Sequence, residues 1–127
     1  MTKILYVDTD TKLASLFLGY LREYGFEAVH SGVSSQTLKT LQASAFDLLI
    51  CDLWCEPVSA RTLCETVRNS EQPHLRDLSI LVIGPEEMQP MEFKWIYKYN
   101  SYFMIKYKSP EEWHQKISTI LNNRSLS

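Results

Sequence analysis

The sequence predicts an α/β protein built on a parallel β-sheet with helices on both of its faces. Short apolar runs of strand length, such as ILYV and DLLICD, alternate along the chain with segments whose apolar residues recur at helical spacing. Strands that are apolar throughout must be covered on both faces, and right-handed crossovers place helices there. The 127 residues suffice for one domain with one sheet.

Strands and helices are expected to alternate from one end of the chain to the other. The strands are predicted at 4–7, 26–30, 47–52, 78–84 and 101–106, each rich in aliphatic or aromatic residues. The helices are predicted at about 11–24, 34–44, 60–69, 90–99 and 110–122. We therefore place the domain at residues 1–122 and interpret 123–127 as a polar tail or the start of a linker.

The signals at helix ends support these boundaries. Asp10 or Thr11 can cap the first helix, and Gly25 stops it. The last helix has the strongest start, because Ser109 at the N-cap and Glu112 three residues later form a capping box, with proline at the first helical position between them. We expect this helix to end near residue 122.

Composition excludes several classes of protein. The formal net charge of −2 gives no general attraction to nucleic acid or to anionic membranes, and no apolar run approaches the length of a membrane-spanning helix. An odd set of cysteines, Cys51, Cys55 and Cys64, without a start typical of secretion, indicates the reducing cytoplasm. We interpret these cysteines as buried thiols.

Three charged residues lie where predicted strands end. Asp8 follows the first strand, Asp52 ends the third, and Lys106 closes the last. Ligands of such sheets bind beyond the carboxyl ends of the strands. Two acids brought together there repel each other unless a cation compensates, and hard oxygen ligands suit Mg²⁺. One such residue alone would be an ordinary polar strand exit, but three at the same edge predict a site.

From Lys3 to about Leu121 the sequence resembles the receiver domain of bacterial two-component response regulators. The matching stretches are ILYVD with Asp8, DLLICD with Asp52, the helix reaching Val67 and Arg68, ILVIG, and YFMIK with Lys106. This resemblance implies a flavodoxin-like, doubly wound sheet of five parallel strands in the order 2-1-3-4-5. It also implies a cytoplasmic signalling module rather than an enzyme.

The resemblance assigns a role to each pocket residue. Asp52 would accept a phosphoryl group from a histidine kinase with the help of Mg²⁺. Asp8, Asp52 and the backbone carbonyl of Trp54 would hold the ion, and Lys106 would balance the charge of the phosphoryl oxygens. These residue types suit phosphoryl transfer, which needs an in-line nucleophile and charge neutralisation more than acid–base groups.

One departure from the family pattern concerns the metal. Where the family has a second acid beside Asp8, this chain has Thr9, whose neutral side chain removes a carboxylate expected to touch the ion. We therefore expect Mg²⁺ to bind weakly. Asp10 and Glu56 are candidates to replace the missing acid, although we favour Asp10 as the cap of the first helix.

Three more departures concern switching. Gly84 stands where the family has a hydroxyl residue, so no side chain is available there to bind a phosphoryl oxygen, and Pro85 stiffens the loop that follows. Without that hydroxyl residue, Phe103 is expected to keep one orientation whatever the pocket holds. Tyr107 replaces a proline whose peptide bond is usually cis in the family, so Lys106 is expected to be aimed differently.

The segment FKWIYKYNSYFMIKYK, residues 93–108, combines lysines with aromatic residues and contains no acid. The family expects a helix followed by a strand here, although the alternating aromatics at 93–99 favour a strand. In receivers this region is read by partners, and exposed aromatics beside cations are typical of protein interfaces. The predicted partner surface consists of Lys94, Trp95, Lys98, Tyr99, Tyr102 and Phe103. Nucleic acid fits less well because the chain is acidic overall and the segment lacks arginine.

Two functions remain open. The first is a signalling module of the two-component type that binds a protein partner and in which phosphorylation has a weak effect or none. The alternative is a conventional Mg²⁺-dependent switch phosphorylated on Asp52. The expected partner is a histidine kinase or a downstream output protein or domain, and a homodimer fits too. In the first case, truncating Trp95 or Tyr102 should weaken binding, whereas truncating Asp52 should not.

Overall fold

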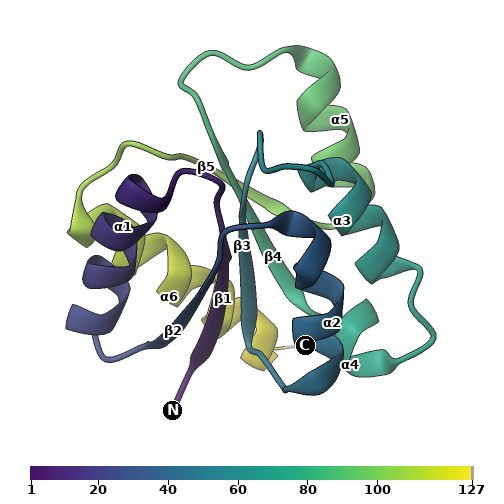
Figure 1. The fold of residues 1–127 in the computed structure, drawn as a ribbon, viewed down its shortest axis with the longest axis horizontal. Coiled ribbons are helices and arrows are strands. Elements are labelled where there is room, and N and C mark those ends of the chain that lie inside the picture. Colours follow the sequence, from purple (N-terminus) through teal and green to yellow (C-terminus); the bar gives the residue numbers. More distant parts are fainter. Residues whose placement is uncertain (127) are drawn as a thin grey trace.

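The computed structural model describes residues 1–126, which form a five-stranded parallel sheet flanked by helices (Figure 1). The strands are β1 (Lys3–Val7), β2 (Glu27–Ser31), β3 (Leu48–Asp52), β4 (Ser79–Gly84) and β5 (Tyr102–Ile105). The helices are α1 (Thr11–Glu23), α2 (Thr37–Ala43), α3 (Ala60–Arg68), α4 (Pro73–Arg76), α5 (Pro90–Lys98) and α6 (Pro110–Leu126), with a 3₁₀ turn at Ser34–Gln36. The strand order is β2-β1-β3-β4-β5, so the predicted fold class and order are confirmed.

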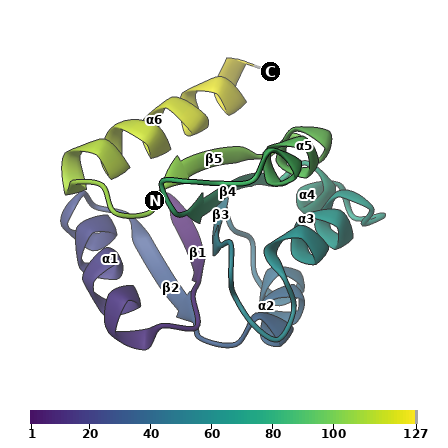
Figure 2. The same ribbon diagram turned by 90° about the horizontal axis from the view of Figure 1, so that it is seen from above.

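Each face of the sheet has its own apolar core. Helices α1 and α6 cover one face, and α2, α3, α4 and α5 cover the other (Figure 2). Successive residues of a strand point to opposite faces, so in β1 Ile4 and Tyr6 enter the core beneath α1 and α6, whereas Leu5 and Val7 enter the other core. Since both faces are packed with side chains, a site must lie at an edge where strands end.

The predicted helix starts are present. One carboxylate oxygen of Asp10 accepts hydrogen bonds from the backbone N–H groups of Lys12 and Leu13, both at 3.1 Å. At α6, the Ser109 hydroxyl accepts from the Glu112 N–H at 3.2 Å, and the Glu112 carboxylate accepts from the Ser109 N–H at 2.9 Å. Asp10 and the capping box therefore satisfy N–H groups that the first turns of these helices leave free.

Segment 90–98 is a helix, as the family pattern implies, and not the strand that its alternating aromatics favour. Pro90 occupies the first helical turn, where its missing N–H costs nothing. Trp95 and Ile96 are the buried residues of this helix, and they pack into the core beneath α3 and α5. The burial of Trp95 and Ile96 in this core outweighs the preference of the alternating aromatic residues for a strand.

The structure contains one helix that was not predicted, and its last helix ends later than predicted. The four-residue helix α4 is too short to show an apolar period, and the sequence did not predict it. Helix α6 continues to Leu126, so the predicted domain end at residue 122 falls inside a helix. Of the predicted tail, Ser127 lies outside the described residues. In the part of the chain that the structure describes, every helix is too short or too polar to cross a membrane.

Candidate functional site

The register of the strands gathers the predicted site residues at one edge of the sheet. Asp52 is paired with Ile83 of β4, and Gly84 with Ile105 of β5, while Asp8 follows the end of the neighbouring β1. A cavity of about 450 Å³ opens there. Its lining consists of Asp8, Thr9, Asp10, Leu13, Asp52, Trp54, Gly84, Pro85, Lys106 and Tyr107.

Asp8, Asp52 and Lys106 form a buried ion triad in this cavity. The ammonium of Lys106 lies 2.7 Å from one carboxylate oxygen of Asp52 and 2.8 Å from one of Asp8. All three residues are buried. Burial acts to lower the pKa of Lys106, but its hydrogen bonds to Asp52 and Asp8 outweigh that effect and hold the pKa above its ordinary value. Lys106 is therefore a buried, protonated partner of both aspartates.

The peptide bond before Tyr107 is trans, and Lys106 nevertheless reaches both aspartates. Within residues 1–126 the cis peptide bond is Glu56–Pro57, so the bond between Lys106 and Tyr107 is trans. The backbone N–H of Lys106 still donates to the carbonyl of Gly84 at 2.8 Å, which holds the end of β5 against the end of β4. The lysine side chain then reaches the two aspartates without a cis bond.

Asp8 and Asp52 also accept hydrogen bonds from neighbouring residues of their own segments. The Tyr6 hydroxyl donates to Asp8 Oδ2 at 2.7 Å, and the Asp10 N–H donates to Asp8 Oδ1 at 3.0 Å. The Trp54 N–H donates to Asp52 Oδ1 at 2.9 Å. Burial, together with the hydrogen bond to Asp8, raises the pKa of Tyr6 far above its ordinary value, so its hydroxyl stays a donor. Each of the four carboxylate oxygens thus has a donor.

The residues near the missing acid serve other purposes. Thr9 accepts a hydrogen bond from the Glu56 N–H through its hydroxyl at 3.0 Å, and so joins the loops after β1 and β3. The Glu56 side chain is exposed and does not line the cavity. Asp10 lines the cavity, but its Oδ1 caps α1. The structure therefore favours the capping role of Asp10 over its role as a metal ligand.

The pocket offers only a few side-chain ligands for Mg²⁺. Mg²⁺ keeps several waters and is often held through one or two carboxylates, which Asp8 and Asp52 can supply. Residues 1–126 contain no group of three His, Cys, Asp or Glu side chains placed to hold a metal. Lys106 cancels one of the two negative charges within the triad. The pocket therefore suits an ion that is weakly held and largely hydrated, with the Trp54 carbonyl as the further predicted ligand.

We expect Mg²⁺ to bind this pocket with a dissociation constant in the millimolar range, because little net negative charge offsets the dehydration of the ion. Trp54 lines the cavity and is 66% exposed, whereas Trp95 and Trp113 are 4% and 1% exposed, so its fluorescence can be followed separately. Titration of the wild type, with Trp54→Phe as the control, measures the affinity. Saturable quenching at submillimolar Mg²⁺ that disappears in Asp52→Asn would contradict this expectation.

Gly84 lies at the wall between the pocket and the core under α5. A Cβ atom built on Gly84 would lie 3.2 Å from Met88 Sδ and 3.2 Å from Phe103 Cε1. The space of a side chain at this position is thus already taken by Met88 and Phe103. The Phe103 ring also packs edge-on against Phe93, with ring centroids 5.4 Å apart. The half-buried ring of Phe103 therefore faces inward and contacts the end of β4.

The predicted partner surface is only partly exposed. Trp95 is 4% exposed, so the expectation that its ring is available to a partner is wrong. Trp95 lies on the side of α5 that faces the core, and its indole N–H donates to the Glu92 carboxylate. Lys94 and Lys98 are exposed, and the half-buried residues of the predicted set are Tyr99, Tyr102 and Phe103.

An exposed stripe nevertheless runs along α5. Tyr97 is 73% exposed, and Met91 is also exposed, at a spacing that places both on the same side of the helix as Lys94 and Lys98. We call Met91, Lys94, Tyr97 and Lys98 the α5 face. The sequence had pointed to the aromatic residues of this segment but not to which of them leave the core.

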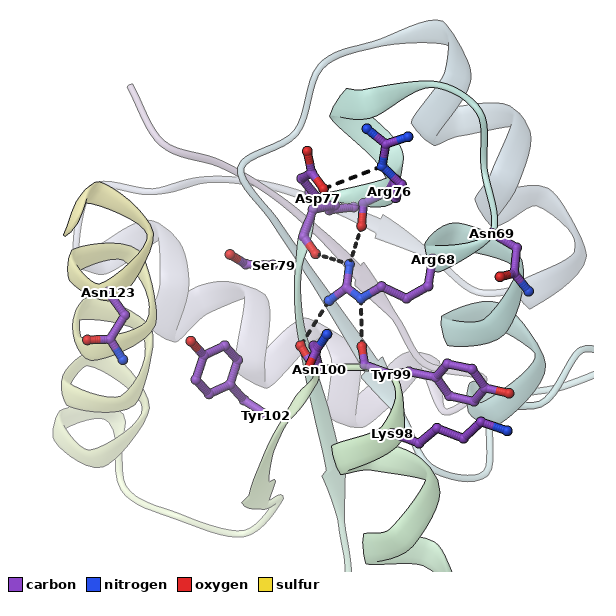
Figure 3. A pocket seen from close by; sticks show the side chains of 11 residues that line it. Arg68, Asn69, Arg76, Asp77, Ser79, Lys98, Tyr99, Asn100, Tyr102 and Asn123 are labelled. Carbon is purple, nitrogen blue, oxygen red and sulfur yellow. Dashed lines mark hydrogen bonds and ion pairs between the residues drawn. The ribbon is translucent and has the colours of Figure 1, made fainter. Parts of the chain in front are cut away.

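A larger hollow of about 960 Å³ lies at the opposite edge of the sheet, where β4 and β5 begin (Figure 3). Arg68 lies at its centre and donates to the backbone carbonyls of Tyr99 and Leu78 at 2.6 Å and of Arg76 and Asn100 at 3.0 Å. Burial lowers the pKa of Arg68. Because the guanidinium is committed to backbone carbonyls, we interpret it as a clamp on two loops.

Comparison with known proteins identifies the fold. No protein-family model matches the sequence, and no curated protein matches it significantly. Among solved structures, the chemotaxis protein CheY4 of Vibrio cholerae has 20% identity and a TM-score of 0.85, over 94% of this chain and 98% of that one. A CheY-like receiver domain protein of Methanospirillum hungatei JF-1 has 17% identity and a TM-score of 0.87, over 98% and 97%. A two-component response regulator of Clostridium difficile has 20% identity and a TM-score of 0.83, over 96% and 97%. The chain has the fold of response-regulator receiver domains, as the sequence resemblance implied.

Proposed function

We propose that this chain is a protein-interaction module of two-component signalling that binds its partner through the α5 face, with phosphorylation of Asp52 having a weak effect or none. The observation that carries the proposal is the filled space beside Gly84, where Phe103 and Met88 occupy the position of a side chain. A ligand shifts a conformational equilibrium only through different affinities for its states. With no side chain at Gly84, a phosphoryl group on Asp52 lacks the contact that would distinguish two positions of Phe103.

The ion triad supports the same proposal. Lys106 lies 2.7 and 2.8 Å from the two aspartates and cancels one of their two negative charges, so only a small net charge is left without an added ligand. Each carboxylate oxygen of Asp8 and Asp52 also has a hydrogen-bond donor. A satisfied, buried network is rigid. The pocket then acts as a structural support for the loops that surround it.

The partner is expected to be a protein that carries acidic groups beside an apolar anchor site. Lys94 and Lys98 supply cationic charge to the α5 face, and Tyr97 and Met91 supply exposed apolar area. A histidine kinase or a downstream output protein of the cytoplasm fits the two-component setting of the solved neighbours. A second copy of the chain, forming a homodimer, is the alternative partner. Nucleic acid fits less well, given the net charge of −2.

The second candidate function is a conventional switch in which Asp52 accepts a phosphoryl group from a histidine kinase. Its support is the convergence of Asp8, Asp52 and Lys106 in a cavity of about 450 Å³ that is open to a phosphodonor. In that case Asp52 would be the nucleophile and Lys106 would pair with the phosphoryl oxygens. Bound Mg²⁺, held by Asp8 and Asp52, would supply charge neutralisation.

Partner binding should depend on Tyr97 and not on Asp52. Truncating an aromatic anchor typically costs about 2 kcal/mol, so Tyr97→Ala should weaken binding about tenfold or more, whereas Asp52→Ala should change it little. Tyr24→Ala, at the end of α1 on the other side of the sheet, is the control for truncating a tyrosine away from the α5 face, with its fold checked by circular dichroism because the Tyr24 ring stacks on His114. Calorimetry with the partner recovered by pull-down and then purified measures all three variants. If Asp52→Ala abolishes binding and Tyr97→Ala binds like the wild type, the protein belongs to the switch class instead.

A further inference from the structure

A buried tyrosine, Tyr6, contacts one member of the triad, Asp8. Tyr6 lies in β1, two residues before Asp8, and its side chain is fully buried. Its hydroxyl donates to Asp8 Oδ2 at 2.7 Å, and the same oxygen accepts from Lys106 Nζ at 2.8 Å. One oxygen atom of Asp8 therefore serves two donors. The resemblance gave no role to Tyr6, because a tyrosine inside an apolar strand is interpreted as core.

The position of this hydroxyl is fixed by the core. The Tyr6 ring lies among the rings of Phe17, His30 and Trp113, with centroid distances of 6.3, 6.1 and 6.2 Å. Close-packed side chains in a core keep one rotamer on average. The hydroxyl oxygen of Tyr6 thus cannot move away from Asp8 unless several large rings move with it.

The other donors to Asp8 differ in how freely they move. The Asp10 N–H, which donates to Asp8 Oδ1 at 3.0 Å, belongs to the backbone at the cap of α1 and is held in place. Lys106 approaches Oδ2 on a long side chain with several rotatable bonds. A divalent cation that binds Asp8 through Oδ2 must therefore displace Lys106, because Tyr6 keeps its share of that oxygen.

We propose that Tyr6 is a positioning residue that holds Asp8 on Lys106 and thereby lowers the affinity of the pocket for divalent cations. The hydroxyl takes a lone pair of Oδ2 that would otherwise be open to the ion, and its donation withdraws charge from the carboxylate. This inference concerns the pocket and not the α5 face. It adds a second cause of weak Mg²⁺ binding to the absence of an acid at Thr9.

The test compares Mg²⁺ affinity of the wild type and Tyr6→Phe. This substitution keeps the ring and removes only the hydroxyl, so the dissociation constant for Mg²⁺ should fall about fivefold or more as the lone pair becomes free. Calorimetry and the fluorescence of Trp54 measure it, and Mn²⁺ is titrated in the same way. Tyr20→Phe is the matched control, because its ring also packs on Phe17, whereas the donors to Asp8 within residues 1–126 are Tyr6, Asp10 and Lys106.

Two further variants keep the inference open to failure. In Tyr6→Phe combined with Asp8→Asn, the gain in affinity should disappear, since the effect acts through Asp8. Tyr6→Leu, which also lacks the hydroxyl, should likewise bind Mg²⁺ more tightly than the wild type. Equal or weaker affinity in the hydroxyl-free variants, no binding by any of them, or a gain that persists without Asp8 would each overturn the inference. These outcomes leave the partner-binding experiment unaffected, so the two proposals fail separately.

Discussion

Replacing Arg68 with methionine should lower the free energy of unfolding by about 3 kcal/mol, because the change leaves four backbone carbonyls without their charged donor. Those carbonyls belong to Arg76 and Leu78 before and at the start of β4, and to Tyr99 and Asn100 before β5. One side chain from the end of α3 thus ties two loops together (Figure 3). Methionine retains much of the apolar stem, so the lost hydrogen bonds account for most of the effect.

Urea unfolding followed by circular dichroism measures the change, and Arg76→Met is the matched control. Arg76 lines the same hollow, but its ion pair with Asp77 is exposed and 3.7 Å long, so its loss should cost well under about 1 kcal/mol. Similar destabilisation by both variants would show that Arg68 is not a special clamp. Arg68→Lys should also be destabilising, because an ammonium cannot span four carbonyls as a planar guanidinium does.

Replacing Lys106 with methionine should cost about 3 kcal/mol of stability at neutral pH. The change leaves two buried carboxylates facing each other without their cation, and breaking a buried ion pair by removing one partner is strongly destabilising. Lys108→Met, in the same loop but outside the cavity lining, is the control and should be nearly neutral. Addition of millimolar Mg²⁺ should restore part of the stability of Lys106→Met, because a cation bound by the folded state shifts the equilibrium towards it.

The pH dependence of this effect follows from the pKa of Lys106. That pKa is raised in the folded protein above its ordinary value of about 10.4. A raised lysine pKa contributes stability that is fully present below the unfolded value and is lost as the pH rises through the folded value. The stability difference between the wild type and Lys106→Met should therefore be the same at pH values of about 7 and 9, and a decline between them would contradict the triad.

The fold could be predicted from the sequence because its signals are local and repeated. Every predicted strand is present, and the caps at Asp10 and Ser109 mark the helix starts that the structure has. Helix α4 was missed, since four residues cannot show a helical period. The end of α6 was placed too early because the polar residues from Asn123 onward were interpreted as tail, whereas the helix continues to Leu126.

Only the site residues that lie at the ends of strands could be predicted from the sequence. Asp8, Asp52 and Lys106 could be placed together because the carboxyl ends of parallel strands share an edge. Trp95 was misplaced, since alternating aromatics do not show which side of a helix faces the sheet. The role of Tyr6 depends on a contact between a core side chain and Asp8, and its only signal was a hydroxyl two residues before the acid, on the same face of the strand.

We infer that the pocket and the α5 face are uncoupled. Phe103 is the residue through which they would communicate, because its ring contacts the position of the Gly84 side chain on one side and Phe93 of α5 on the other. The claim therefore predicts that the state of this ring does not depend on what the pocket holds. Met88, which also fills the space at Gly84, should likewise stay in place.

The most direct measurement is a pair of crystal structures, one with Mg²⁺ and beryllofluoride as the phosphoryl mimic on Asp52 and one without. We expect Phe103 to keep its inward orientation in both, with Phe93 and Met88 still packed beside it. An outward rotation of Phe103 in the structure with beryllofluoride, accompanied by a shift of α5, would contradict the account and identify the chain as a phosphorylation switch.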